Sequence, residues 1–254
     1  MSTEPIQSRS VRLRRLVRQF HRWLGLLIAI QILFWVMGGL VMSALHLEAV
    51  RGEHLTAKQE PVALDHQANL FPLTQMLENQ QPATVTGVTL TTFLSQPVYR
   101  LETSAGQQLL DAITGRTLLP LPEATVRAIA LADYAGAADI RGVEWVDTPA
   151  LEYRGRDLPL WRVRFDDERD TTLYISPATG QVVARRNDLW RIFDFVWMLH
   201  IMDYQEREDF NHPLLVITAA TALLFVVTGL LMLVFSFRSR RAERGLDSGL
   251  DSRV

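Results

Sequence analysis

Cysteine is missing from all 254 residues of the chain. Its absence excludes disulfides, thiol nucleophiles, thiolate ligands for zinc or an iron–sulfur cluster, and the C-x-x-C-H attachment of a covalent haem. A large net charge is missing as well, because 26 basic and 28 acidic side chains leave a formal charge of −2. That balance argues against nucleic acid as a partner. Any haem would have to be held non-covalently.

Motifs of common soluble enzymes are also missing. The chain contains no G-x-S-x-G, no H-E-x-x-H, no P-loop and no dinucleotide-binding fingerprint. Hydrolase and nucleotide-dependent chemistry therefore have no support. These absences leave open whether the chain is part of a membrane oxidoreductase.

A long apolar run is present near the end of the chain. Residues 214–237 read LLVITAATALLFVVTGLLMLVFSF and contain no charge, which exceeds the roughly 20 residues needed to cross a hydrocarbon core. Asn211 suits an N-cap, and Pro213 suits a first helical turn. We predict a membrane span at 212–237.

A second apolar run, 23–45, follows a stretch rich in arginine. It is longer than the core of a signal peptide and no A-x-A-like cleavage site follows it, so we predict an uncleaved span at 23–46. The basic segments 1–22 and 238–254 flank the two spans, which places both termini in the cytosol by the positive-inside rule. We expect a bacterial inner-membrane protein with a periplasmic central region, a compartment that suits a chain without thiols.

The segment 188–204, before the second span, is apolar but contains Arg191 and Asp194. It is too short to cross a membrane and too apolar for a solvated helix. Trp190 and Trp197 are seven residues apart, so they share one helix face, as aromatic residues at a membrane surface do. We predict an interfacial helix.

A pattern of strands and turns occurs twice between the spans. The stretch 99–116 resembles 161–181, and the matching glycines Gly115 and Gly180 lie 65 residues apart. Each copy reads as a helix packed on a short antiparallel sheet, which predicts a duplicated α+β domain. We assign the copies, the first with its preceding linker, to 47–120 and 121–187, with helices at about 71–80 and 123–134 and their first strands at 84–94 and 140–146.

With these features the chain resembles the PepSY-associated transmembrane family. The residues that carry the resemblance are His21-Arg22-Trp23-Leu24-Gly25-Leu26, Tyr174-Ile175-Ser176-Pro177-Ala178-Thr179-Gly180-Gln181-Val182, Trp197-Met198-Leu199-His200 and Thr228-Gly229-Leu230. The resemblance implies a periplasmic PepSY region between membrane helices. Larger relatives with four spans include siderophore–iron reductases that hold b-type haems between histidines, whereas this chain has two predicted spans.

Four histidines lie near the predicted membrane faces. His46, His200 and His212 belong to the outer face, while His21 lies at the cytosolic face. Taken with the resemblance, this arrangement makes them candidate haem b ligands, with His200 and His212 first as ligands of the iron.

Structural roles compete with ligation at each of these histidines. His21 could contact lipid headgroups, and His46 and His212 could be plain boundary residues. His200 could be hydrogen-bonded to Asp203 or Asp194. The acidic loop 203–210 could bind a metal, although a solvated connector fits it better because its carboxylates lack the spacing of a calcium loop.

These features lead to two functional hypotheses and a weaker third. The first is a haem-b-binding electron-transfer component, with iron or siderophore reduction as one candidate role. The second is a non-enzymatic PepSY module held at the membrane that binds, inhibits or helps to assemble a partner protein. The third is a regulatory sensor. Besides the lipid bilayer, we expect a homodimer or a membrane redox partner subunit, and the small residues Gly39 and Ser43 would allow a close helix approach.

Overall fold

The computed structural model falls into two units, which are described separately. We call Met1–Ala44 with Asp194–Val254 the helix unit, and Leu45–Phe193 the sheet unit. The boundary lies inside helix α5. The structure describes the backbone of residues 6–58, 69–78 and 84–250, and the side chains of residues 11–58, 69–78 and 84–237.

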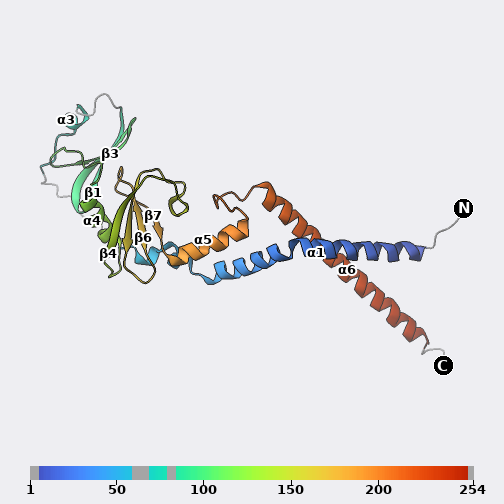
Figure 1. The fold of residues 1–254 in the computed structure, drawn as a ribbon. Coiled ribbons are helices and arrows are strands. Elements are labelled where there is room, and N and C mark those ends of the chain that lie inside the picture. The colour runs from blue at the N-terminus through green and yellow to red at the C-terminus, as the bar shows by residue number, and fades with distance from the viewer. Residues whose placement is uncertain (1–5, 59–68, 79–83, 251–254) are drawn as a thin grey trace. The chain divides into compact units, whose positions relative to one another are not determined.

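Two long helices make up most of the helix unit (Figure 1). α1 is Ile6–Ala44 and α6 is Pro213–Leu250. By length and composition, Val11–Ala44 and Pro213–Phe237 could each cross a membrane, which confirms the predicted pair of apolar helices. Among the described side chains of the second helix, only that of Thr228 is buried. Such a surface needs lipid or a partner around it.

α1 and α6 cross in an antiparallel sense, because later residues of α1 meet earlier residues of α6 (Figure 1). The guanidinium of Arg14 lies 5.8 Å from the ring centroid of Phe235. At Gly25, an added Cβ would lie 2.9 Å from Phe225, so the missing side chain makes room for that ring. The close approach thus occurs at Gly25. At Gly39, by contrast, an added Cβ would meet no described atom within 4 Å.

α5, Asp188–Ile201, packs its second half against α1. A Cβ added at Gly38 would lie 3.2 Å from Val196, so this glycine allows the two helices to approach. The contact region lies about 9 to 20 Å along the axis of α1 from its end, from the rise of an α-helix. The predicted interfacial helix therefore exists as a helix, and its second half lies alongside the first apolar helix.

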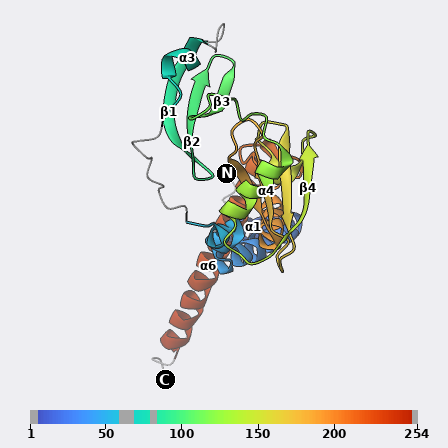
Figure 2. The ribbon, with the colours of Figure 1, turned by 90° about the vertical axis from the view of Figure 1, so that its left-hand side faces the viewer.

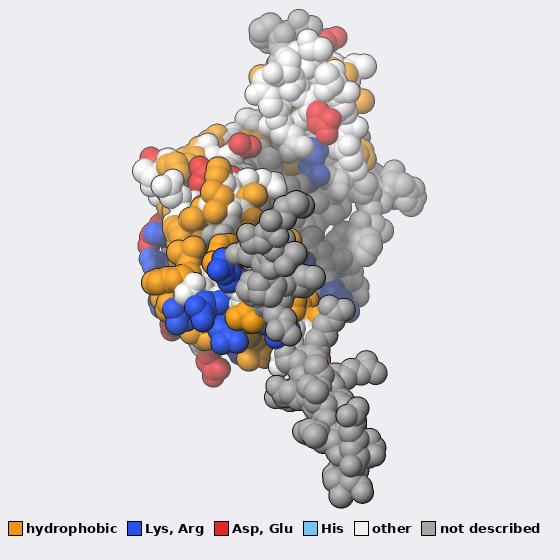
Figure 3. Space-filling view, turned by 90° about the vertical axis from the view of Figure 1, so that its right-hand side faces the viewer, with side chains coloured by type: hydrophobic (Ala, Val, Ile, Leu, Met, Phe, Trp, Pro, Cys, Tyr) orange, Lys and Arg blue, Asp and Glu red, His pale blue; other side chains and the backbone are white. Residues whose placement is uncertain are grey.

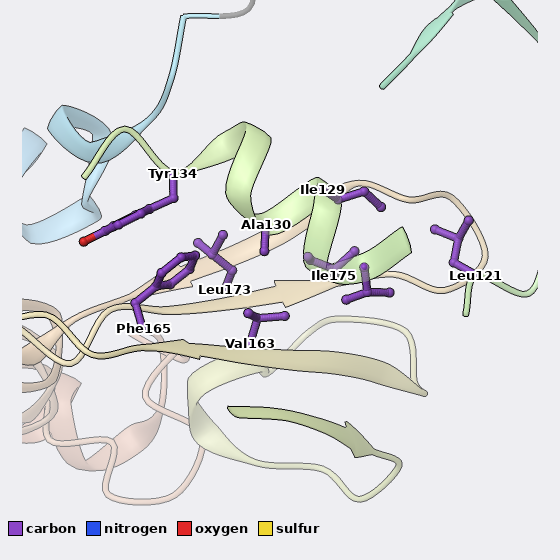
Figure 4. Close-up of a cluster of buried hydrophobic side chains, with 9 residues drawn as sticks. Leu121, Ile129, Ala130, Tyr134, Val163, Phe165, Leu173 and Ile175 are labelled. Atoms are coloured by element: carbon purple, nitrogen blue, oxygen red, sulfur yellow. The ribbon is translucent and has the colours of Figure 1, made fainter. Parts of the chain in front are cut away.

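The second copy of the repeat forms a four-stranded antiparallel sheet with one helix on its face (Figure 4). Nine buried residues, including Val163, Phe165 and Leu173, form the core between this helix and the sheet. η2, Leu151–Tyr153, packs Tyr153 with Tyr174 in a separate cluster. The elements are α4 Glu123–Asp133, β4 Ile140–Val146, β5 Leu160–Phe165, β6 Thr172–Ile175 and β7 Val182–Arg186.

The first copy is smaller (Figure 2). Its three strands form an antiparallel sheet in the order β1-β2-β3, and five buried residues, among them Met76 and Leu101, form its core. The elements are α3 Leu73–Glu78, β1 Val85–Phe93, β2 Gln96–Thr103 and β3 Gly106–Asp111. The end of the predicted helix at about 71–80 lies outside the described residues.

Gly115 and Gly180 occupy equivalent turns, as the sequence repeat predicted. Both have a positive φ, +71° and +69°, which glycine adopts without a steric cost. Each N–H donates to the carbonyl four residues earlier, at 2.9 Å and 2.8 Å. An aromatic side chain of the first copy covers each glycine: Phe71 lies against Gly115, and Phe93 of β1 lies against Gly180. Two small antiparallel sheets with helices confirm the predicted α+β region between the two apolar helices.

The segment after α1 docks on the second copy. α2, Leu47–Arg51, ends at Gly52 with φ +68°, and η1, Glu53–Leu55, follows. The side-chain amide of Asn187 donates to the carbonyl of Ala49 at 2.9 Å. This bond holds α2, at the start of the sheet unit, beside the residue that directly follows β7.

Candidate functional site at the end of helix α5

Three side chains satisfy the carbonyls at the C-terminal end of α5. The last carbonyls of a helix have no intrahelical partner, and in apolar surroundings each unsatisfied group is costly. Here three consecutive carbonyls each receive one donor. The bonds are Gln31 Nε2 to Leu199 O at 3.0 Å, Trp35 Nε1 to His200 O at 2.7 Å, and His212 Nε2 to Ile201 O at 2.9 Å.

His212 also caps α6. Because the Ile201 carbonyl can only accept, Nε2 of His212 carries the proton, and Nδ1 is left as an acceptor. The N–H of Leu215 donates to this Nδ1 at 3.4 Å. His212 is thus the N-cap residue of a helix that begins at Pro213. The predicted N-cap, Asn211, is wrong by one residue, and its N–H donates to Asp209 Oδ1 at 2.7 Å instead.

His200 lies among aromatic rings. Its ring centroid is 6.5 Å from that of Trp35 and 6.4 Å from that of Trp197. Its Nδ1 is buried and has no hydrogen-bond partner among the described residues. This Nδ1 therefore makes neither of the expected bonds, to Asp194 or to Asp203.

Asp194 of α5 holds the connection between α5 and α6 in place through an ion pair. It is 4% exposed and forms an ion pair with Arg207. The indole N–H of Trp197 donates to the Arg207 carbonyl at 3.1 Å. One arginine of the acidic loop is therefore held against α5 by both its side chain and its backbone.

Asp203 organises the rest of the acidic loop 203–210. Burial alone would raise the pKa of its carboxyl, but hydrogen bonds from four loop N–H groups lower this pKa to about 2. Those donors are the N–H groups of Gln205, Glu206, Glu208 and Asp209, at 3.0 to 3.2 Å. The carboxylate thus serves as a loop cap, and no group of three metal-ligating side chains occurs among the described residues.

His21 lies at the crossing of α1 and α6. Its ring stacks on Phe225 with a centroid separation of 4.2 Å, and Nδ1 lies 2.9 Å from Thr228 Oγ1 and 3.1 Å from the Phe225 carbonyl. A Cβ added at Gly229 would be 3.2 Å from the ring. Two segments that carry the family resemblance are therefore in contact, because Thr228-Gly229 receives the ring of His21.

His46 belongs to the sheet unit. It is exposed and stands at the N-cap of α2 without a side-chain capping bond. Of the four predicted ligands, the structure joins His200 and His212 to one helix end and places His21 at a separate contact.

A haem held between two histidines needs one free ring nitrogen from each. His212 uses both ring nitrogens for backbone caps, so it does not fit as a ligand in this arrangement. His21 fits better, because its Nδ1 is held by a hydrogen bond and its Nε2 is left for another role, as in many metal-binding histidines. His200 has an unpartnered Nδ1.

A groove lies in the sheet unit where the two copies meet. It has a volume of about 420 Å³, which falls in the range of about 300 to 1,000 Å³ for ligand pockets. Its lining is mostly apolar. The first copy contributes Phe93, Leu94, Gln96, Val98 and Asp111, the connection contributes Thr117, Leu118, Leu121 and Pro122, and α4 contributes Thr125.

Sequence reasoning missed Gln31 and Trp35, which cap α5. Both stand inside the apolar run 23–45. A glutamine in a membrane span is costly unless it is hydrogen-bonded, so Gln31 was a signal for a polar contact.

In comparisons with known proteins, the sequence matches no family model, no curated protein and no solved structure.

Proposed function

We propose that this chain is a membrane-anchored binding module. Its two apolar helices cross the inner membrane with both termini in the cytosol, and the sheet unit lies in the periplasm, where it binds an extended segment of a partner protein. The resemblance to the PepSY-associated family supports this division of roles. The groove between the two copies is the observation that carries the proposal.

The chemistry of the groove suits apolar side chains of a peptide. Its one carboxylate, Asp111, already accepts the N–H groups of Ile113 and Thr114 at 2.8 Å. β1 is an edge strand that pairs only with β2 among the described strands, and its last residue, Phe93, lines the groove. A peptide could add to this edge through main-chain hydrogen bonds and place a side chain in the groove.

Site-specific photo-crosslinking in cells tests the groove. A photo-reactive residue at Leu94, which is 36% exposed, should give one defined adduct, and filling the groove by Thr125→Trp should remove it. The same probe at Leu131, exposed on α4 outside the groove, serves as the control. Equal adducts at both positions, or an adduct that survives Thr125→Trp, would contradict the proposal.

The topology has its own test. Reporter fusions at the C-terminus should show cytosolic activity, because arginines follow the second apolar run. Periplasmic activity there would reject the orientation and leave the groove experiment unaffected.

A second candidate is a haem-b-binding electron-transfer component. The bonded Nδ1 of His21 and the unpartnered Nδ1 of His200 favour it. One chain offers a single histidine at the cytosolic face, so an inner haem would need His21 from two copies or a histidine from another subunit. The purified protein should then be a dimer or a complex with b-type bands on reduction. A colourless protein that gives no pyridine haemochrome favours the binding module.

A further inference from the structure

The groove between the two copies contains a single charged side chain. Of the residues that line it, only Asp111 is ionisable, and the others are apolar or carry neutral hydroxyl or amide groups. Among the described residues, no Lys, Arg or His side chain forms an ion pair with this carboxylate. Figure 3 shows a face of the molecule on which basic and acidic side chains are both exposed, whereas the groove carries one sign of charge.

The turn after β3 holds the carboxylate of Asp111 in place. The N–H groups of Ile113 and Thr114 both donate to Oδ1 at 2.8 Å, and the hydroxyl of Thr114 also donates to the carboxylate. The backbone N–H of Asp111 donates to the carbonyl of Arg116 at 2.9 Å. Because a carboxylate can accept about four hydrogen bonds, these donors leave part of its capacity for a ligand.

The second copy of the repeat shows that this turn does not require a charge. Ser176 holds the place of Asp111, because each lies four residues before its turn glycine, Gly180 or Gly115. The N–H of Ser176 donates to the carbonyl of Gln181 at 3.0 Å, and the N–H of Gly180 donates to the carbonyl of Ser176 at 2.8 Å, as in the first copy. A neutral side chain therefore suffices for the backbone of the turn, and the negative charge of Asp111 needs another explanation.

The surroundings of Asp111 favour a cation. Burial would raise the pKa of its carboxyl, but hydrogen bonds from Thr114 and Ile113 hold this pKa below the ordinary value of 3.8, so the group is ionised at neutral pH. The lining beside it includes the buried side chains of Val98 and Leu121. Opposite charges attract each other more strongly in such apolar surroundings than in water. A groove with one negative charge thus suits a ligand with one positive charge.

We propose that the groove selects a peptide segment in which a lysine or arginine side chain donates to the carboxylate of Asp111 and neighbouring apolar side chains fill the rest of the groove. This inference rests on the proposed function and deepens it, because it names the chemistry of the partner segment. The contact is a charge-assisted hydrogen bond, which is stronger than one between neutral groups. Asp111 then determines specificity, while the edge of β1 and the apolar lining contribute binding to many sequences.

Peptide selection on the full-length protein tests this preference. Short random peptides displayed on phage are selected against the protein in mild detergent, and a selected peptide is then synthesised with lysine or with acetyl-lysine, which lacks the charge, at its basic position. For the wild type, we expect a basic residue at one fixed position and roughly tenfold weaker binding of the acetylated peptide, the effect of one charge-assisted hydrogen bond. Asp111→Asn should bind the two peptides equally, because its amide oxygen still accepts from the turn but carries no charge.

Further variants keep the outcomes distinct. Asp111→Ser, which copies the second turn, should behave like Asp111→Asn, whereas Glu102→Gln removes an exposed carboxylate of β2 outside the groove and should discriminate like the wild type. Selected peptides without a basic preference, or a difference that persists in both Asp111 variants, would overturn this inference. If those peptides fail to bind Thr125→Trp, the proposed groove still stands. Failure to select any peptide, or binding that Thr125→Trp leaves unchanged, would overturn the proposed function and this inference with it.

Discussion

The helix unit and the sheet unit differ in what their polar side chains do. In the helix unit, Gln31, Trp35 and His212 each donate to a backbone carbonyl at the end of α5. In the sheet unit, charged side chains also form networks with one another, such as that of Glu152 with Arg191 and Tyr174. Water can satisfy loose backbone groups around a soluble sheet but not within an apolar layer. A few polar residues in an apolar helix therefore become structural caps.

This contrast changes the interpretation of the histidines. Intramembrane ionisable residues indicate functional sites by default, and together with the family resemblance this made the histidines candidate haem ligands. The structure gives His212 a complete set of backbone partners. A histidine beside a helix end should therefore be tested for capping before a cofactor is assigned to it.

The largest expected effect is a loss of stability confined to the sheet unit. Phe165→Ala removes a fully buried ring from the core between α4 and its sheet, which should cost about 3 to 5 kcal/mol of unfolding free energy. Hydrogen exchange should increase in the second copy, while α1 and α6 keep their protection. Loss of protection in both units would show that they unfold together.

A smaller loss of thermal stability should distinguish substitutions at two glycines of α1. Gly25→Val places a side chain against Phe225, whereas Gly39→Val meets open space. Overpacking of this kind costs about 1 to 3 kcal/mol, so thermal stability in mild detergent should fall for Gly25→Val. The Gly39→Val protein should melt like the wild type. If Gly39→Val instead shifts a dimer to a monomer, that face contacts a second copy.

Removing one cap tests the role of polar groups in the helix unit. Trp35→Phe keeps an aromatic ring but leaves the His200 carbonyl without its donor, at a cost of about 1 to 3 kcal/mol. Faster hydrogen exchange should be confined to the last turn of α5. Trp23→Phe, at a 66% exposed position, is the control and should change nothing. Equal effects of the two substitutions would reject the capping role.

The charged network of the sheet unit should make the stability of the protein depend on pH. Burial would raise the pKa of Glu152, but hydrogen bonds from Arg191 and Tyr174 keep it below the ordinary value of 4.5. A lowered pKa in the folded state stabilises the protein above the unfolded pKa, and this stability is lost as pH falls through the folded value. Glu152→Gln should therefore flatten the decline of melting temperature below about pH 4.5. Parallel curves for variant and wild type would contradict this contribution.

Local patterns predicted most of the elements. The alternation of apolar residues predicted first strands at 84–94 and 140–146, close to the observed β1 and β4. The repeated Thr-Gly turn predicted equivalent places for Gly115 and Gly180, because only a residue tolerant of positive φ fits there. Hydropathy predicted both long helices, since uncharged runs of such length have few other structures.

The sequence by itself determined the two apolar helices, the duplicated α+β pattern and the absence of thiol chemistry. Each of these depends on neighbouring residues or on composition. Only the tertiary structure decided which polar group meets which carbonyl at the end of α5, and that Thr228 and Gly229 receive His21. Except for the bond of His212 to Ile201, which are 11 positions apart, these contacts join residues more than 150 positions apart, and no local periodicity encodes a pairing over that separation.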